Sequence, residues 1–214
     1  GQLYDIALLS EFCKANGMYL IVDAISAFLA DEISMSKYGI DALIISSQKA
    51  LALEPGISMV VLSPRAYSER AITIKSPTYY LDLKHHILDQ ERGQTPFTPA
   101  VGTLLCLNDM LHMVDDIGID EKIRRTRTLA EYFRQCAMDI GLRIPTYPLS
   151  NAVTPILFDG DAMEVYKRLN DGYGITVTPS GGELKAHMLR VGHIGNLDKT
   201  DYDVLISALK EILQ

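Results

Sequence analysis

Apolar and polar positions alternate along the first part of the chain in blocks that predict helices and strands in turn. Residues 3–15 carry apolar side chains at helical spacing, and Asn16-Gly17 is a typical helix stop. Residues 18–22 and 40–45 are short continuous apolar runs, typical of buried strands. Helices that alternate with short buried strands predict an α/β fold.

The pattern changes near residues 115–118, where a polar stretch ending in Gly118 interrupts a long apolar-striped helix expected at 100–114. We place a domain boundary there, with residues 1–117 as part of a large mixed-sheet α/β domain and 118–214 as a small α+β domain. Residues 76–94 look irregular. We also expect helices at 120–140, 162–170 and 199–213, and strands at 57–62, 142–144, 153–158, 175–177 and 188–192. Asp198 is expected to cap the helix at 199–213.

Composition narrows the function classes. The 214 residues are 48% apolar, which is enough for a real core, and the net charge of −7 argues against a nucleic-acid-binding face. No apolar run is long enough to span a membrane, and no signal peptide is visible. The three cysteines lie far apart within helical patterns, so we expect no metal site and buried thiols in the cytoplasm.

The first candidate for chemistry is Lys49, which follows the expected strand at 40–45 through the small polar residues Ser46-Ser47-Gln48. Open α/β sheets place ligands at the carboxyl ends of their strands. A lysine there suits a Schiff base to an aldehyde cofactor, because apolar neighbours lower the pKa of its amine. A solvated lysine at a strand end is the alternative.

Asp23 ends the preceding apolar run in the same way, so Asp23 and Lys49 lie at the ends of two successive expected strands. Pyridoxal phosphate requires both groups: an amine for its aldehyde carbon, and a carboxylate that keeps its pyridine nitrogen protonated. Asp23 could instead be a helix N-cap or a turn residue. The ordered pair favours the cofactor.

Several motifs together resemble the class V, fold-type I, pyridoxal-phosphate-dependent aminotransferases, and most closely the alanine–glyoxylate and serine–pyruvate branch. The resemblance covers essentially the whole chain in the expected order but not the family's N-terminal portion. The motifs are Val22-Asp23-Ala24-Ile25-Ser26-Ala27, Gly39-Ile40-Asp41, Ser46-Ser47-Gln48-Lys49-Ala50-Leu51, Pro55-Gly56, Thr95-Pro96-Phe97-Thr98-Pro99 and Leu189-Arg190-Val191-Gly192-His193-Ile194-Gly195.

The resemblance implies a role for each matching residue. Lys49 would carry pyridoxal phosphate as a Schiff base and then move the substrate's α-proton. Asp23 would hold the proton on the ring nitrogen, Ile25 would pack against the ring face, and Gln48 would donate a hydrogen bond to the cofactor. Arg190 would hold the substrate's α-carboxylate, for which its planar fork is suited. From spacing alone, an edge-strand arginine paired with a local acid is an equal alternative.

The Thr95–Thr98 segment implies a homodimer, because in the family it reaches the cofactor phosphate of the partner subunit. Thr95 and Thr98 are the candidate residues, although Gln94 stands where the family has an aromatic phosphate contact. Thr98 could instead be a simple helix N-cap. Residues 178–182, which are rich in glycine, are expected to form a mobile loop at the mouth of the site.

The resemblance thus implies transamination between an amino acid and a 2-oxo acid. Since the family's N-terminal portion is missing from these residues, we expect the isolated chain to bind pyridoxal phosphate weakly and to turn over little. The alternatives are a non-catalytic fragment, a dimerisation or binding module of the same fold, or another class V enzyme such as a 2-aminoethylphosphonate transaminase or a lyase. A desulfurase would need a reactive cysteine on a loop, and the cysteines here look helical.

Overall fold

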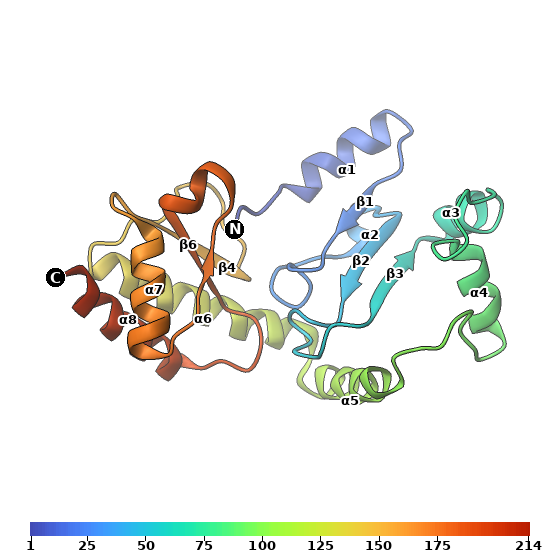
Figure 1. Ribbon diagram of the computed structural model, residues 1–214. Helices are drawn as coiled ribbons and strands as arrows, with labels where there is room; N and C mark the ends of the chain where they lie inside the picture. The colour runs from blue at the N-terminus through green and yellow to red at the C-terminus, as the bar shows by residue number, and fades with distance from the viewer. The chain divides into compact units, whose positions relative to one another are not determined.

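A computed structural model describes all 214 residues, which divide into two compact units (Figure 1). We call them the N-terminal unit and the C-terminal unit. The N-terminal unit comprises Asp5–Ser26 and Ile33–Met113, and the C-terminal unit comprises Gly1–Tyr4, Ala27–Glu32 and Val114–Gln214. The main division therefore falls inside helix α5 (Val101–Ile117).

The N-terminal unit is built on a three-stranded mixed sheet of order β1-β2-β3 (Figure 1). β1 (Ile21–Asp23) runs parallel to β2 (Ala42–Ser46), and β3 (Ser58–Leu62) is antiparallel to β2. β2 is the central strand and is buried along nearly all its length, as its continuous apolar sequence predicts. The helices of this unit are α1 (Ile6–Ala15), α2 (Met35–Tyr38), α3 (Pro64–Ala66), α4 (Leu83–Glu91) and the first part of α5, with a π-helical turn at Tyr67–Ala71.

The C-terminal unit has an antiparallel sheet of order β4-β6-β5. β4 spans Val153–Leu157, β5 spans Thr178–Pro179 and β6 spans Met188–Gly192. Its helices are α6 (Ile119–Asp139), α7 (Ala162–Tyr173) and α8 (Lys199–Leu213), with a 3-10 helix at Gly182–Ala186. The prediction that Asp198 caps α8 is confirmed: Asp198 accepts from the Thr200 N–H and forms a capping box with Asp201.

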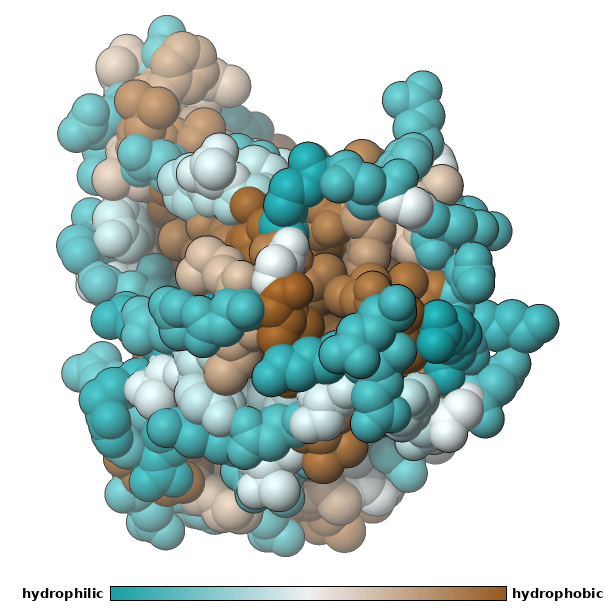
Figure 2. Space-filling model, turned by 90° about the vertical axis from the view of Figure 1, so that its left-hand side faces the viewer, coloured by the Kyte–Doolittle hydropathy of each residue, from teal (hydrophilic) through white to brown (hydrophobic).

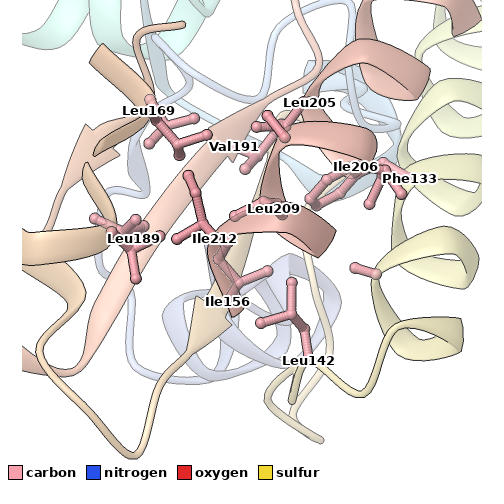
Figure 3. Packing of buried hydrophobic residues seen from close by; sticks show 14 of the residues in the cluster. Phe133, Leu142, Ile156, Leu169, Leu189, Val191, Leu205, Ile206, Leu209 and Ile212 are labelled. Atoms are coloured by element: carbon pink, nitrogen blue, oxygen red, sulfur yellow. The ribbon is translucent and has the colours of Figure 1, made fainter. Parts of the chain in front are cut away.

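One apolar core holds the C-terminal unit together. Phe133 of α6, Leu169 of α7, and Leu205 and Leu209 of α8 meet the sheet residues Ile156, Leu189 and Val191, and most of these side chains are fully buried (Figure 3). Burying each large side chain of this kind stabilises the fold by about 1.5–3 kcal/mol. β6 is thereby anchored as the middle strand of a packed layer.

Some local predictions differ from the structure. Residues 142–144 form only an isolated bridge, Arg143 to Leu157, and the strand expected at 175–177 begins instead at Thr178. Helix α4 lies in the stretch expected to be irregular. The cysteines do lie on helices α1, α5 and α6, but Cys106 is exposed, so the expectation of a buried thiol is wrong there.

The surface is not uniformly polar. Figure 2 shows one face on which apolar side chains gather in a hollow bordered by polar ones. In the N-terminal unit, Leu8 and Phe12 of α1 and Ile21 of β1 are more than half exposed. Every helix is too short or too polar to cross a lipid bilayer.

Candidate active site

Lys49 lies in a turn that immediately follows the central strand β2. The turn is fixed by the buried residue Ser47, whose Oγ donates to the Glu54 carbonyl at 2.7 Å and whose N–H donates to the Ile57 carbonyl at 3.0 Å. The Ala52 N–H donates to the Lys49 carbonyl at 2.9 Å, and Ala52 takes the left-handed conformation with φ of 54°. The Lys49 side chain is half-buried, and its amine makes no hydrogen bond or ion pair within the chain.

Asp23 is the last residue of β1, and the parallel pairing of β1 with β2 places it opposite Ile44. The carboxyl ends of the two strands therefore lie at the same end of the sheet, as expected. Asp23 is exposed, and its Oδ1 accepts the Ile25 N–H at 3.0 Å, as a turn residue would. This hydrogen bond fixes the direction of the carboxylate and leaves Oδ2 available to a ligand.

Gln48 is exposed beside Lys49, and its amide is oriented by the last residue of β2. The Ser46 hydroxyl donates to Gln48 Oε1 at 2.5 Å. Since the amide oxygen is engaged there, the Nε2 group is free to donate to a ligand. Ile25, which follows Asp23 by two residues, is half-buried and offers an apolar surface.

Thr95 and Thr98 are exposed in the N-terminal unit, before helix α5. Thr95 Oγ1 donates to the Phe97 carbonyl at 2.7 Å, which holds the segment in a tight turn. The alternative that Thr98 is a helix N-cap is wrong, because α5 begins at Val101 and its first turn closes on the Ala100 carbonyl. Neither hydroxyl is used to begin the helix.

Arg190 lies on β6, in the C-terminal unit. Its Nη2 donates to the Pro179 carbonyl at 3.0 Å, and its Nε is buried without a partner. The alternative of an edge-strand arginine paired with a local acid is wrong, because β6 is the middle strand and the partner is a carbonyl. Four of the predicted residues thus lie at the carboxyl ends of β1 and β2, namely Asp23, Ile25, Gln48 and Lys49. Arg190 belongs to the other compact unit.

Two features of the C-terminal unit were not singled out from the sequence. Ser180, in the glycine-rich stretch, has a buried hydroxyl without a partner. His193 is 1% exposed and belongs to a buried polar network with Thr154 and Tyr202. The available signals were that His193 directly follows β6, within the quoted motif at 189–195, and that Ser180 lies in the glycine-rich stretch at 178–182.

The chain matches one protein family and is similar to several known proteins. The sequence model of the family described as aminotransferase class-V matches residues 1–189. The chain is similar to the small subunit of a soluble hydrogenase of Synechococcus sp. strain PCC 6716, with 30% identity over 100% of this chain and 56% of that protein. It is also similar to alanine–glyoxylate aminotransferase of Callithrix jacchus, with 28% identity over 100% of this chain and 54% of that protein.

Among solved structures, the fold is similar to that of alanine–glyoxylate aminotransferase from Nostoc sp. The TM-score is 0.88 with 27% identity, over 100% of this chain and 59% of that chain. The chain thus spans about half the length of the curated relatives that it matches.

Proposed function

This chain belongs to the class V aminotransferase family, and we propose that it supplies the lysine and the carboxylate of a transaminase site acting between an amino acid and a 2-oxo acid. The family depends on pyridoxal phosphate. The observation that carries the proposal is the placement of Asp23 and Lys49 at the carboxyl ends of the adjacent parallel strands β1 and β2. Relatives named as alanine– and serine–glyoxylate aminotransferases favour substrates of that type.

The residues present suit this cofactor. An aldehyde needs an amine that is not tied to a carboxylate, and the Lys49 amine makes no ion pair. A protonated pyridine nitrogen needs a carboxylate with a free oxygen, and Asp23 uses only Oδ1 in its turn. An amide donor is oriented beside the lysine by Ser46. The donor set therefore fits pyridoxal phosphate.

Pyridoxal phosphate, when bound, supplies an electron sink for the electrons of the substrate's breaking Cα–H bond. Lys49 Nζ would take that proton and return it, as a general base and then an acid. The Asp23 carboxylate would hold the proton at the ring nitrogen. Gln48 Nε2 would donate to the cofactor, Ile25 would pack against its ring, and Arg190 would bind the α-carboxylate of the substrate.

We also propose that the functional form is a cytoplasmic homodimer. Thr95 and Thr98 are exposed and unused by helix α5. The Thr98 hydroxyl is therefore available to a phosphate held by a second subunit, whereas the Thr95 hydroxyl would have to leave the Phe97 carbonyl to donate to it. All three cysteines are free, which is usual in a reducing compartment.

The test is a pyridoxal phosphate titration of the chain, followed by absorbance and by borohydride reduction. We expect a reducible adduct whose peptide mass maps to Lys49. Lys49→Ala should abolish the adduct, while Lys75→Ala, which removes an exposed lysine of the same unit, should keep it. An adduct that persists in Lys49→Ala, or that maps elsewhere, would overturn the assignment. If the parent forms no adduct, the chain acts as a non-catalytic module.

A further inference from the structure

Two buried polar atoms without partners lie on β6 and on the residue that directly follows β5. They are Oγ of Ser180 and Nε of Arg190. Native proteins pair nearly all buried polar atoms, because an unpaired buried donor loses its hydrogen bond to water and gains nothing in return. Two such atoms in one segment indicate a place where a ligand supplies the missing acceptor.

The backbone brings the two residues into one patch. β5 pairs with β6 so that Thr178 lies opposite Arg190, and the Ser180 N–H donates to the Met188 carbonyl at 3.2 Å. Arg190 Nη2 donates to the carbonyl of Pro179, the residue directly before Ser180. The guanidinium is therefore held against the chain that carries the Ser180 hydroxyl.

The chemistry of the two atoms defines the ligand. Arginine Nε can only donate, and a serine hydroxyl donates readily to an anion. A carboxylate has two oxygens and about four lone-pair directions, so it can accept from both groups. We propose that Ser180 is a second substrate-binding residue, which together with Arg190 forms the receptor for the α-carboxylate of the amino acid or 2-oxo acid. This inference rests on the proposed function and adds a residue to it.

The receptor also predicts selectivity. If an amide replaced the carboxylate, its N–H₂ group would face either Arg190 Nε–H or the Ser180 hydroxyl. Both groups are donors, so that hydrogen bond could not form. We therefore expect the site to bind pyruvate and to discriminate against pyruvamide, which has the same shape without the charge. Ser180 contributes to this discrimination because it adds a donor beside the arginine fork.

The experiment is an NMR titration of the ¹⁵N-labelled chain with pyruvate and with pyruvamide, without pyridoxal phosphate. The Arg190 Nε–H signal, assigned by its loss in Arg190→Lys, should shift with pyruvate and stay in place with pyruvamide. Ser180→Ala should weaken pyruvate binding about tenfold, the usual size for one hydrogen bond to a charged group. Ser180→Thr should retain most of the affinity. Thr176→Ala is the control, because it removes an exposed hydroxyl bonded to Asn170.

Equal pyruvate affinity in Ser180→Ala and the parent would overturn the proposal, as would an Arg190 Nε–H signal that pyruvate does not move. If Ser180→Ala does not fold, Ser180→Cys keeps the size with a weaker donor, and the same loss of affinity is expected. The titration needs neither Lys49 nor the cofactor. Pyruvate binding without a Lys49 adduct would therefore contradict the proposed function alone, and an adduct without Ser180-dependent binding would contradict this inference alone.

Discussion

Within the C-terminal unit, Arg134 Nε donates to the hydroxyl of Thr154 at 2.9 Å, and this bond begins a buried relay. Thr154 Oγ1 lies 2.8 Å from His193 Nε2, and His193 Nδ1 lies 3.0 Å from the Tyr202 hydroxyl. The Tyr202 hydroxyl in turn donates to the Gly192 carbonyl at 3.2 Å. Since the tyrosine proton is used there, every group is satisfied when His193 is neutral with its proton on Nδ1.

The relay predicts how stability depends on pH. Burial, helped by the charge of Arg134, lowers the pKa of His193 to about 3, well below the value of about 6.5 expected in the unfolded chain. Between these values the unfolded state binds a proton that the folded state does not. The contribution of His193 is therefore complete above pH ~6.5 and falls by up to about 1.4 kcal/mol per pH unit as the pH drops toward 3.

His193→Gln should remove this part of the pH dependence. Urea unfolding at pH 7, 6 and 5 measures it, as the slope of unfolding free energy against pH. His187→Gln, which replaces an exposed histidine of the same unit, should keep the slope of the parent. An unchanged slope in His193→Gln would mean that other groups cause the acid sensitivity.

The sequence predicts those helices and strands that are determined by residues close together in the chain. The strand at 188–192 and the helix at 199–213 match the structure. The strand is marked by apolar residues on both sides of Arg190 and the helix by its Asp198 cap, and both signals lie in neighbouring residues. Helix α4 was missed because it buries none of its residues, so it has no apolar stripe to detect. The start of β5 at Thr178 was missed because it depends on pairing with β6, which is a tertiary property.

The same distinction applies to the site. The positions of Asp23 and Lys49 at strand ends followed from two apolar runs, and the parallel register of β1 and β2 agrees with them. The unpaired state of Ser180 Oγ could not be predicted, because it depends on which atoms of other segments surround the hydroxyl.

Asp23→Asn tests the proposed role of the carboxylate. The amide has nearly the same shape but no charge, so it would not hold the proton at the ring nitrogen of pyridoxal phosphate. We expect alanine–glyoxylate transamination to fall on the order of 100-fold, as when one preorganised electrostatic group is lost. Affinity for the cofactor, measured by absorbance titration, should change much less. Asp115→Asn, at an exposed position of α5, is the control and should keep the rate of the parent. An unchanged rate in Asp23→Asn would exclude the proposed role of the Asp23 carboxylate.

Arg190→Lys tests carboxylate binding. The ammonium keeps the positive charge but not the planar fork, so the Michaelis constant for glyoxylate or pyruvate should rise about tenfold or more, with a smaller change in kcat. Arg127→Lys, on the exposed face of α6, should leave both constants as they are. If Arg190→Lys changes thermal stability alone, the arginine is structural.

Asp41 should be a major determinant of stability in the N-terminal unit. It is 4% exposed and accepts hydrogen bonds from Arg65 at 2.6 Å, from Ser63 at 3.0 Å and from the Leu20 N–H at 3.0 Å. Asp41→Ala leaves the buried Leu20 N–H and the Ser63 hydroxyl without this acceptor, whereas Arg65 is half exposed and still donates to the Met18 carbonyl. We therefore expect a loss of about 2 kcal/mol in unfolding free energy. Asp89→Ala, which removes a surface pair with Arg92, should cost no more than about 1 kcal/mol. Denaturant unfolding of both variants measures the two losses of unfolding free energy. Equal losses in Asp41→Ala and Asp89→Ala would contradict the prediction.

Ile21 should control self-association of the chain. β1 is an edge strand of the N-terminal sheet, and Ile21 on it is 64% exposed. An apolar edge of this kind pairs readily with another chain, and a lysine on the edge prevents such pairing. Ile21→Lys should therefore reduce the fraction of species larger than a dimer in sedimentation velocity at rising protein concentration. Leu81→Lys makes the same charge change at a residue that is 70% exposed but lies in no strand, and it should leave association unchanged. If both variants dissociate equally, added charge rather than the edge of β1 is the cause.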